Sequence, residues 1–189
     1  ANTWEAHYFD VNKDNVVALA REAKEIGAEV LVLDDGWFKN RGDDRRALGD
    51  WIPDETKFPG GLGDTVNSVR ELGMGFGLWV EPEMVNPDSE LFRRHPDWIL
   101  SAGGQDSMLA RNQLTLDLSR AEVVDYLLDL LSGIFSSAPI TYVKWDMNRN
   151  MSEIGSSALT EESQGETAHR YMLGLYRLWN TLIRRFPHI

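Results

Sequence analysis

The sequence predicts an α/β protein, and more specifically a partial (β/α)8 barrel of the TIM type that contains the first five βα units. Short apolar runs alternate with amphipathic stretches, which is the pattern of βαβ units around a parallel sheet. Two of the amphipathic stretches end at a glycine, Gly27 and Gly73, as helices commonly do. Four of the five apolar runs end in carboxylates, at the strand ends where α/β folds bind ligands.

The predicted strands are apolar runs of five or six residues. They cover residues 4–9, 29–33, 75–80, 114–118 and 140–145. The helices predicted to follow them cover residues 12–26, 62–72, 87–95, 119–135 and 166–185. In each longer helix the apolar residues recur every three or four positions, as Val16, Ala20 and Ala23 do in the first.

Two of these helices have recognisable start signals. Asn86 is predicted to cap the third helix, with Pro87 at its first position, because proline there loses no intrahelical hydrogen bond. The run Ser119 to Glu122 reads as a capping box at the start of the fourth helix.

The length leaves two α/β architectures open. Eight βα units need about 250 residues, so the 189 residues of this chain fit a doubly wound open sheet better than a closed barrel. The barrel interpretation therefore takes residues 1–189 as an incomplete catalytic barrel domain of a longer polypeptide. It also predicts that strands one and five have open edges, which a homo-oligomer or further chain would cover.

Composition excludes several classes of protein. The 30 acidic and 19 basic residues give a formal charge of −11, which argues against nucleic-acid and membrane-surface binding. No apolar stretch is long enough to span a bilayer, and residues 1–6 do not resemble a signal peptide. The absence of cysteine rules out disulfides and thiolate metal sites, and it is compatible with the cytoplasmic location that we expect.

The last predicted strand carries the most informative polar residues. Side chains alternate between the two faces of a strand, so Lys144 and Asp146 point the same way and Asn148 follows at the end. A buried lysine and aspartate are costly unless they pair or take part in chemistry. A structural ion pair is one interpretation, and a functional site at the carboxyl end of the strand is the one we favour.

Carboxylates interleaved with tryptophans suggest a sugar as the ligand, because acids and amides hold hydroxyls and an indole stacks on the apolar face of a pyranose. The acids at the strand ends are Asp34, Asp35, Glu81, Glu83, Asp117 and Asp146. The same acids leave open a metal-dependent barrel enzyme with magnesium or manganese. The sequence has neither a glycine-rich phosphate loop nor a serine nucleophile elbow.

Seven motifs in register closely resemble the family-36 retaining α-galactosidases of the bacterial type. They include Leu-Asp-Asp-Gly-Trp-Phe at 33–38 and Lys-Trp-Asp-Met-Asn at 144–148. The full set covers residues 4–10, 33–38, 48–51, 77–85, 95–98, 116–120 and 143–149. The resemblance runs in order over nearly the whole chain and corresponds to the N-terminal part of the catalytic barrel.

The resemblance implies a role for each candidate residue. Asp146 matches the catalytic nucleophile, and Asp34 and Asp35 match the pair that binds galactose hydroxyls. The remaining substrate-binding residues that it implies are Trp4, Trp79, Arg111, Lys144 and Asn148. Glu81 and Glu83 either touch the substrate or orient the pocket.

The resemblance also implies the reaction, which is retaining hydrolysis of terminal α-galactosides of the melibiose and raffinose type, with no cofactor and no metal. The acid/base aspartate of the family lies beyond its sixth strand and has no counterpart here, and the flanking β-domains of the family are absent as well. We therefore expect the 189-residue chain alone to be inactive or nearly so. A non-catalytic galactose-binding barrel fragment and a metal-dependent barrel enzyme are the alternatives.

Overall fold

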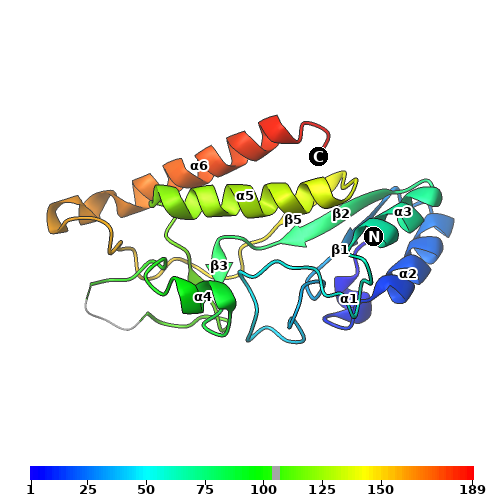
Figure 1. Ribbon diagram of the computed structural model, residues 1–189, viewed down its shortest axis with the longest axis horizontal. Helices are drawn as coiled ribbons and strands as arrows, with labels where there is room; N and C mark the ends of the chain where they lie inside the picture. The colour runs from blue at the N-terminus through cyan, green and yellow to red at the C-terminus, as the bar shows by residue number, and fades with distance from the viewer. Residues whose placement is uncertain (104–106) are drawn as a thin grey trace.

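The computed structural model describes residues 1–103 and 107–189, and it is organised around a three-stranded parallel sheet (Figure 1). The strands are β1 (Val30–Leu33), β2 (Gly75–Val80) and β5 (Tyr142–Trp145), in the order β1-β2-β5. The predicted α/β class with a parallel sheet is confirmed. All three strands end at the same edge of the sheet, which is where the polar residues that follow them meet.

Glycine in the central strand allows the three strands to lie together in this register. Val32, Gly77 and Tyr142 form one row across the sheet. A Cβ atom on Gly77 would lie 2.9 Å from Val32 Cγ2 and 2.9 Å from Tyr142 Cδ1, closer than carbon atoms pack. The absent side chain therefore makes room for both neighbouring strands.

Four longer helices accompany the sheet, and all four were predicted within a few residues. They are α2 (Lys13–Glu25), α3 (Gly63–Glu71), α5 (Ala121–Ser137) and α6 (Thr167–Arg185). Figure 1 shows α5 and α6 side by side along one side of the molecule, and α2 and α3 beside each other at the other end. Each helix turns an apolar stripe inward, as the periodicity predicted.

The remaining elements are short. The segment α4 (Glu90–Arg94) is a short α-helix, and η1 (Glu161–Glu166) is a short 3₁₀-helix. The strand β3 (Met84–Val85) pairs antiparallel with β4 (Leu114–Thr115). None of the helices in the described residues is long and apolar enough to cross a membrane.

The first predicted strand, residues 4–9, is wrong. These residues instead contain α1 (Trp4–His7), a single helical turn. The turn begins here because the Asn2 side chain accepts a hydrogen bond from the Trp4 backbone N–H at 2.7 Å. The extended chain lies just before it, where Thr3 N donates to Val32 O at 3.1 Å along the edge of β1. Alternating apolar residues over so short a run did not distinguish the two conformations.

The fourth predicted strand, residues 114–118, is also wrong as a member of the parallel sheet. Only Leu114–Thr115 is a strand, and it pairs with β3 rather than with β2. The free edge of β2 is taken directly by β5. The five predicted βα units therefore reduce to three parallel strands in the described residues.

Neither predicted cap is formed, because the side chains of Asn86 and Ser119 are held by other partners. The Asn86 amide is buried among other partners, and α4 begins later, where Ser89 Oγ accepts from Phe92 N at 3.1 Å. Ser119 Oγ donates to Asp117 Oδ1, and α5 begins after Arg120 with no side-chain cap.

The close approach at Gly77 predicts a stability effect. We expect Gly77→Ala to lower the free energy of unfolding by about 1–3 kcal/mol, because its methyl group would overlap both flanking strands. Gly133→Ala in α5 is the matched control, since nothing lies within 4 Å of its Cβ position, and it should be neutral or stabilising by about 0.5–1 kcal/mol. Chemical denaturation measures both, and equal effects at the two sites would contradict the packing argument.

Candidate active site

A cavity of about 300 Å³ lies at the carboxyl ends of β1, β2 and β5. All the site residues predicted from the sequence line it: Trp4, Asp34, Asp35, Trp79, Arg111, Lys144, Asp146 and Asn148. The lining also includes Phe9, Arg41, Asp44, Glu81 and Gln113. Its size is at the lower end of the range for small-molecule sites.

The end of β1 supplies two carboxylates with different partners. Asp35 is clamped by Arg41, whose Nε and Nη2 donate to its two carboxylate oxygens at 2.9 and 2.8 Å. Burial raises the pKa of Asp35, and the adjacent guanidinium opposes that rise. This bidentate pairing fixes the plane of the carboxylate at the cavity wall.

The second carboxylate, Asp34, joins β1 to β5. Lys144 Nζ donates to Asp34 Oδ2 at 2.7 Å, and Asn2 Nδ2 donates to the same oxygen at 2.7 Å. The structural Lys144–Asp146 ion pair considered from the sequence is not formed, because Lys144 pairs with Asp34 instead. The pair links β1 to β5, and because both residues line the cavity, their polar atoms can also contact a ligand.

Asp146 follows β5 directly and accepts three hydrogen bonds. Trp79 Nε1 and Asn148 Nδ2 donate to Oδ2 at 2.9 and 2.7 Å, and the Met147 backbone N–H donates to Oδ1 at 3.0 Å.

Burial alone would raise the pKa of Asp146, but these donors and the positive charge of Lys144 outweigh it and hold the pKa below its ordinary value. Asp146 is therefore an ionised carboxylate at neutral pH.

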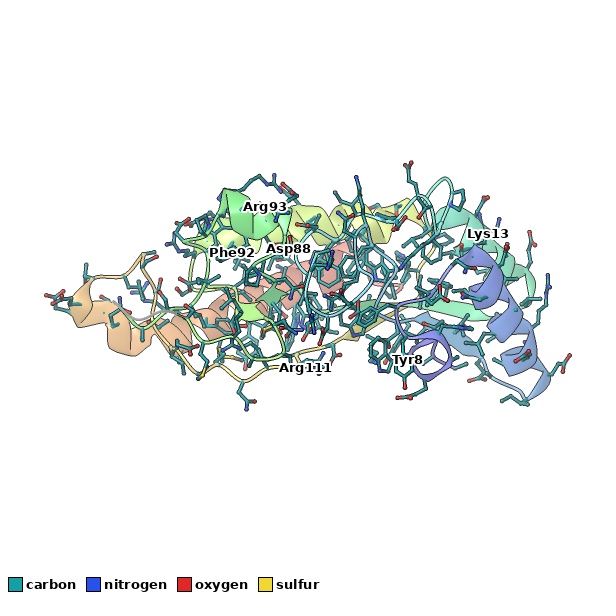
Figure 2. All side chains as sticks on the ribbon, turned by 90° about the horizontal axis from the view of Figure 1, so that it is seen from below. Tyr8, Lys13, Asp88, Phe92, Arg93 and Arg111 are labelled. Carbon is teal, nitrogen blue, oxygen red and sulfur yellow. The ribbon has the colours of Figure 1, made fainter. Side chains whose placement is uncertain are left out.

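Arg111 comes from the loop before β4 and reaches the site through Asn148. Its Nη1 donates to Asn148 Oδ1 at 2.8 Å, and the residue is exposed. Arg111 and Asn112 both have positive φ, 51° and 59°, so this loop holds a conformation that non-glycine residues rarely adopt. Figure 2 shows Arg111 on the same edge of the molecule as Tyr8 of the N-terminal turn.

Glu81 is a buried carboxylate in the floor of the cavity, only 1% exposed. Its Oε1 accepts from the Asn148 backbone N–H at 2.5 Å and its Oε2 from Gln113 Nε2 at 3.0 Å. Burial, together with the charges of Asp146 and Asp35, raises its pKa to about 7, although the Asn148 bond opposes the rise.

Glu83 lies two residues further on and has a different environment. It accepts hydrogen bonds from Trp145 Nε1 at 2.9 Å and from the Tyr171 hydroxyl, which joins α6 to the sheet. It is not part of the cavity lining. Of the two acids considered together from the sequence, Glu81 faces the cavity and Glu83 holds the helix behind it.

Indole and phenyl rings form the apolar part of the lining. Trp4 and Phe9 meet edge to face with ring centroids 5.2 Å apart. Trp79 is 2% exposed and packs against Trp51, with centroids 5.7 Å apart. Trp79 therefore presents its N–H rather than a broad face to the cavity, whereas Trp4 is half-buried and more accessible.

Four of the lining residues were not recognised from the sequence: Phe9, Arg41, Asp44 and Gln113. An arginine in a polar loop is usually solvated, so nothing marked Arg41 as the buried partner of Asp35. Phe9 was placed in a strand that the structure does not contain. Among residues 1–103 and 107–189, no group of three or more His, Asp or Glu side chains is arranged to hold a metal ion.

Fold and site together define an α/β protein whose parallel strands end at an acidic, indole-lined cavity. A family model described as melibiase matches residues 1–189. The chain belongs to the melibiase family, as the motifs predicted.

The relatives that it matches include several α-galactosidases. α-Galactosidase AgaA of Geobacillus stearothermophilus is 60% identical over 188 residues, and an α-galactosidase of Escherichia coli is 46% identical; each match covers 100% of this chain and 26% of the relative. The chain thus spans about a quarter of the length of these relatives.

Solved structures agree in fold. The crystal structure of the glycoside hydrolase family 36 enzyme AgaA has a TM-score of 0.96 at 60% identity, covering 100% of this chain and 26% of that one. The α-galactosidase of Lactobacillus brevis has a TM-score of 0.95 at 48% identity, covering 99% and 25%. Variants of AgaA have been solved in complex with raffinose and with stachyose.

The raised pKa of Glu81 predicts how stability changes with pH. Because the folded protein holds this proton more tightly than the unfolded chain, the stabilisation is fully present below about pH 4.5 and is lost as the pH rises through about 7. The loss amounts to at most about 3 kcal/mol.

Glu81→Gln keeps the shape and removes the titration. We expect the free energy of unfolding of the wild type, relative to this variant, to fall between about pH 4.5 and 7. Denaturation at several pH values measures the difference, and a constant difference would contradict the raised pKa.

Proposed function

We propose that this chain carries the nucleophile side of the active site of a retaining α-galactosidase, and that the cavity at the strand ends binds the terminal α-linked galactose. The single observation that carries the proposal is the environment of Asp146, a hydrogen-bonded carboxylate of lowered pKa that lines the same cavity as Asp34 and Asp35. Membership of the melibiase family supports the same activity.

Asp146 is the proposed nucleophile. A retaining glycosidase attacks the anomeric carbon with an ionised carboxylate, forms a covalent glycosyl-enzyme, and releases it by hydrolysis. The donors on Asp146 keep the carboxylate ionised and fix its plane before the sugar arrives. The lone pairs that these donors leave free are available for attack.

The carboxylates after β1 are proposed to hold the galactose ring. Asp34 and Asp35 can each accept hydrogen bonds from sugar hydroxyls, and Lys144 can donate to one. Asp34 is held by its ion pair with Lys144, and Asp35 by its ion pair with Arg41, before any sugar binds. Less side-chain entropy is therefore lost when the sugar binds. Such contacts accelerate the reaction where they strengthen as the ring flattens.

The remaining predicted residues complete the proposed pocket. Trp4 offers an accessible indole for the apolar face of the sugar, and Arg111 and Asn148 lie together at the rim. The proposed substrates are α-galactosides of the melibiose and raffinose type. Two AgaA variants solved with raffinose and stachyose support this choice.

A retaining enzyme also needs a proton donor about 5–5.5 Å from the nucleophile. Glu81 has the raised pKa of such a group, but both of its oxygens already accept hydrogen bonds within the floor of the cavity. We propose instead, as the resemblance to the family implies, that the donor is the aspartate that the family carries beyond its sixth strand. In this proposal β1, β2 and β5 belong to a (β/α)8 barrel, and residues 1–189 form part of that catalytic domain.

Replacement of Asp146 tests the proposal. We expect Asp146→Ala in the complete protein to lower kcat on p-nitrophenyl α-galactoside by about a thousandfold or more, because the variant lacks the carboxylate that is proposed to form the covalent intermediate. Asp117→Asn is the control, since Asp117 is a fully buried carboxylate that does not line the cavity.

Full activity of Asp146→Ala would remove Asp146 as nucleophile. Galactose binding by a wild-type protein without hydrolysis would favour the sugar-binding alternative, and loss of activity with a chelator would favour the metal-dependent one.

The hydrogen bond from Trp79 predicts a shift in the pH profile. Trp79→Phe keeps an aromatic ring and removes the N–H that donates to Asp146 Oδ2, so the pKa of Asp146 should rise. The acid limb of kcat/KM is expected to move to higher pH in the variant. A profile that superimposes on that of the wild type would show that this bond does not control the ionisation of Asp146.

A further inference from the structure

Among the described residues, Glu81 is the buried carboxylate lining the cavity that the proposed mechanism does not use. It directly follows β2, and because Val80 is paired with Trp145, the residues after the two strands, Glu81 and Asp146, lie next to each other. Its contacts are made to the backbone of Asn148 and to Gln113, not to another charged side chain. This placement puts it beside Asp146 without a direct contact.

We propose that Glu81 is a positioning residue for Asp146, which fixes the Asp146–Asn148 segment by accepting the hydrogen bond of the Asn148 backbone N–H. The inference rests on the proposed function and adds a residue to it. Glu81 acts through Asn148, whose side-chain Nδ2 donates to Asp146 Oδ2 at 2.7 Å.

The segment after β5 depends on such an anchor. The last backbone bond to the sheet is from Asp146 N to Val80 O at 2.9 Å, and residues 146–148 are neither helix nor strand. The Met147 N–H donates to the Asp146 carboxylate itself, so it holds the side chain and not the segment. Arg149 anchors the far end of the segment by donating to Gln113 O at 2.7 Å, and Glu81, directly after β2, holds the Asn148 backbone between these two points.

The position of Glu81 is fixed from its other side. Gln113 Nε2 donates to Glu81 Oε2, and Gln113 stands next to β4, which is paired with β3. Gln113 Oε1 is buried and has no hydrogen-bond partner. A 180° turn of the Gln113 amide would present this oxygen to a donor at position 81 without moving the backbone.

This geometry separates the hydrogen bond of Glu81 from its charge. In Glu81→Gln, the amide oxygen can still accept from Asn148 N, and its N–H₂ can donate to the turned Gln113 amide. Burial already raises the pKa of Glu81 to about 7, so a neutral side chain is compatible with the site. In Glu81→Asp the charge remains, but the side chain is one methylene shorter and loses reach to Asn148.

Steady-state kinetics of the complete protein with p-nitrophenyl α-galactoside test the proposal. We expect Glu81→Asp to lower kcat about 10- to 100-fold, because a small misplacement of the nucleophile is costly. Glu81→Gln should keep kcat within about threefold of the wild type. KM should change less than about threefold in both, since Glu81 does not hold the sugar.

Glu83→Gln is the matched control, because it makes the same change at an equally buried glutamate that does not line the cavity. It should lower the thermal midpoint and leave kcat within about threefold. Hydrogen exchange of the peptide containing Asn148 gives a readout independent of activity, and exchange should be faster in Glu81→Asp than in Glu81→Gln.

Retention of activity by Glu81→Asp with loss in Glu81→Gln would overturn the proposal, because the charge would then matter more than the reach. Equal kinetics and equal exchange in the two variants would overturn it as well. A wild-type protein without α-galactosidase activity would instead overturn the proposed function, and the exchange measurement would still decide the role of Glu81.

Discussion

The parallel register of β1, β2 and β5 is the constraint on which the site depends. Leu33, Leu78 and Val143 form one row of the sheet, so the next residue of each strand or strand end lies in the following row. That row brings Asp34 within reach of Lys144, and their ion pair spans the sheet across the strand that carries Trp79. Residues more than a hundred positions apart thus meet because three strands end together.

The acids that share the cavity differ in pKa because they differ in burial and in the hydrogen-bond donors around them. Asp146 receives a backbone, an indole and an amide donor and has a lowered pKa, whereas burial raises the pKa of Glu81. Environments that push the pKa values of neighbouring carboxyl groups apart are typical of sites that divide roles between them. Here Asp146, which accepts the hydrogen bond from Trp79, is the carboxylate that stays ionised.

The sequence predicted the three parallel strands, the long helices and most residues of the cavity, because burial patterns and strand-end acids are local signals. It failed where a single side chain decided the conformation: Asn2 starts a helical turn at Trp4, and Asn86 is a buried partner of Arg41 rather than a helix cap. Pairings such as Arg41 with Asp35 depend on a loop path that no local pattern encodes.

Covalent trapping tests the central claim most directly. A fluorinated galactosyl fluoride that slows breakdown of the glycosyl-enzyme should label the complete protein once per chain, and peptide mapping by mass spectrometry should place the label on Asp146. Labelling of Asp34, Asp35 or Glu81 instead, or hydrolysis of the substrate without any label on Asp146, would contradict the account.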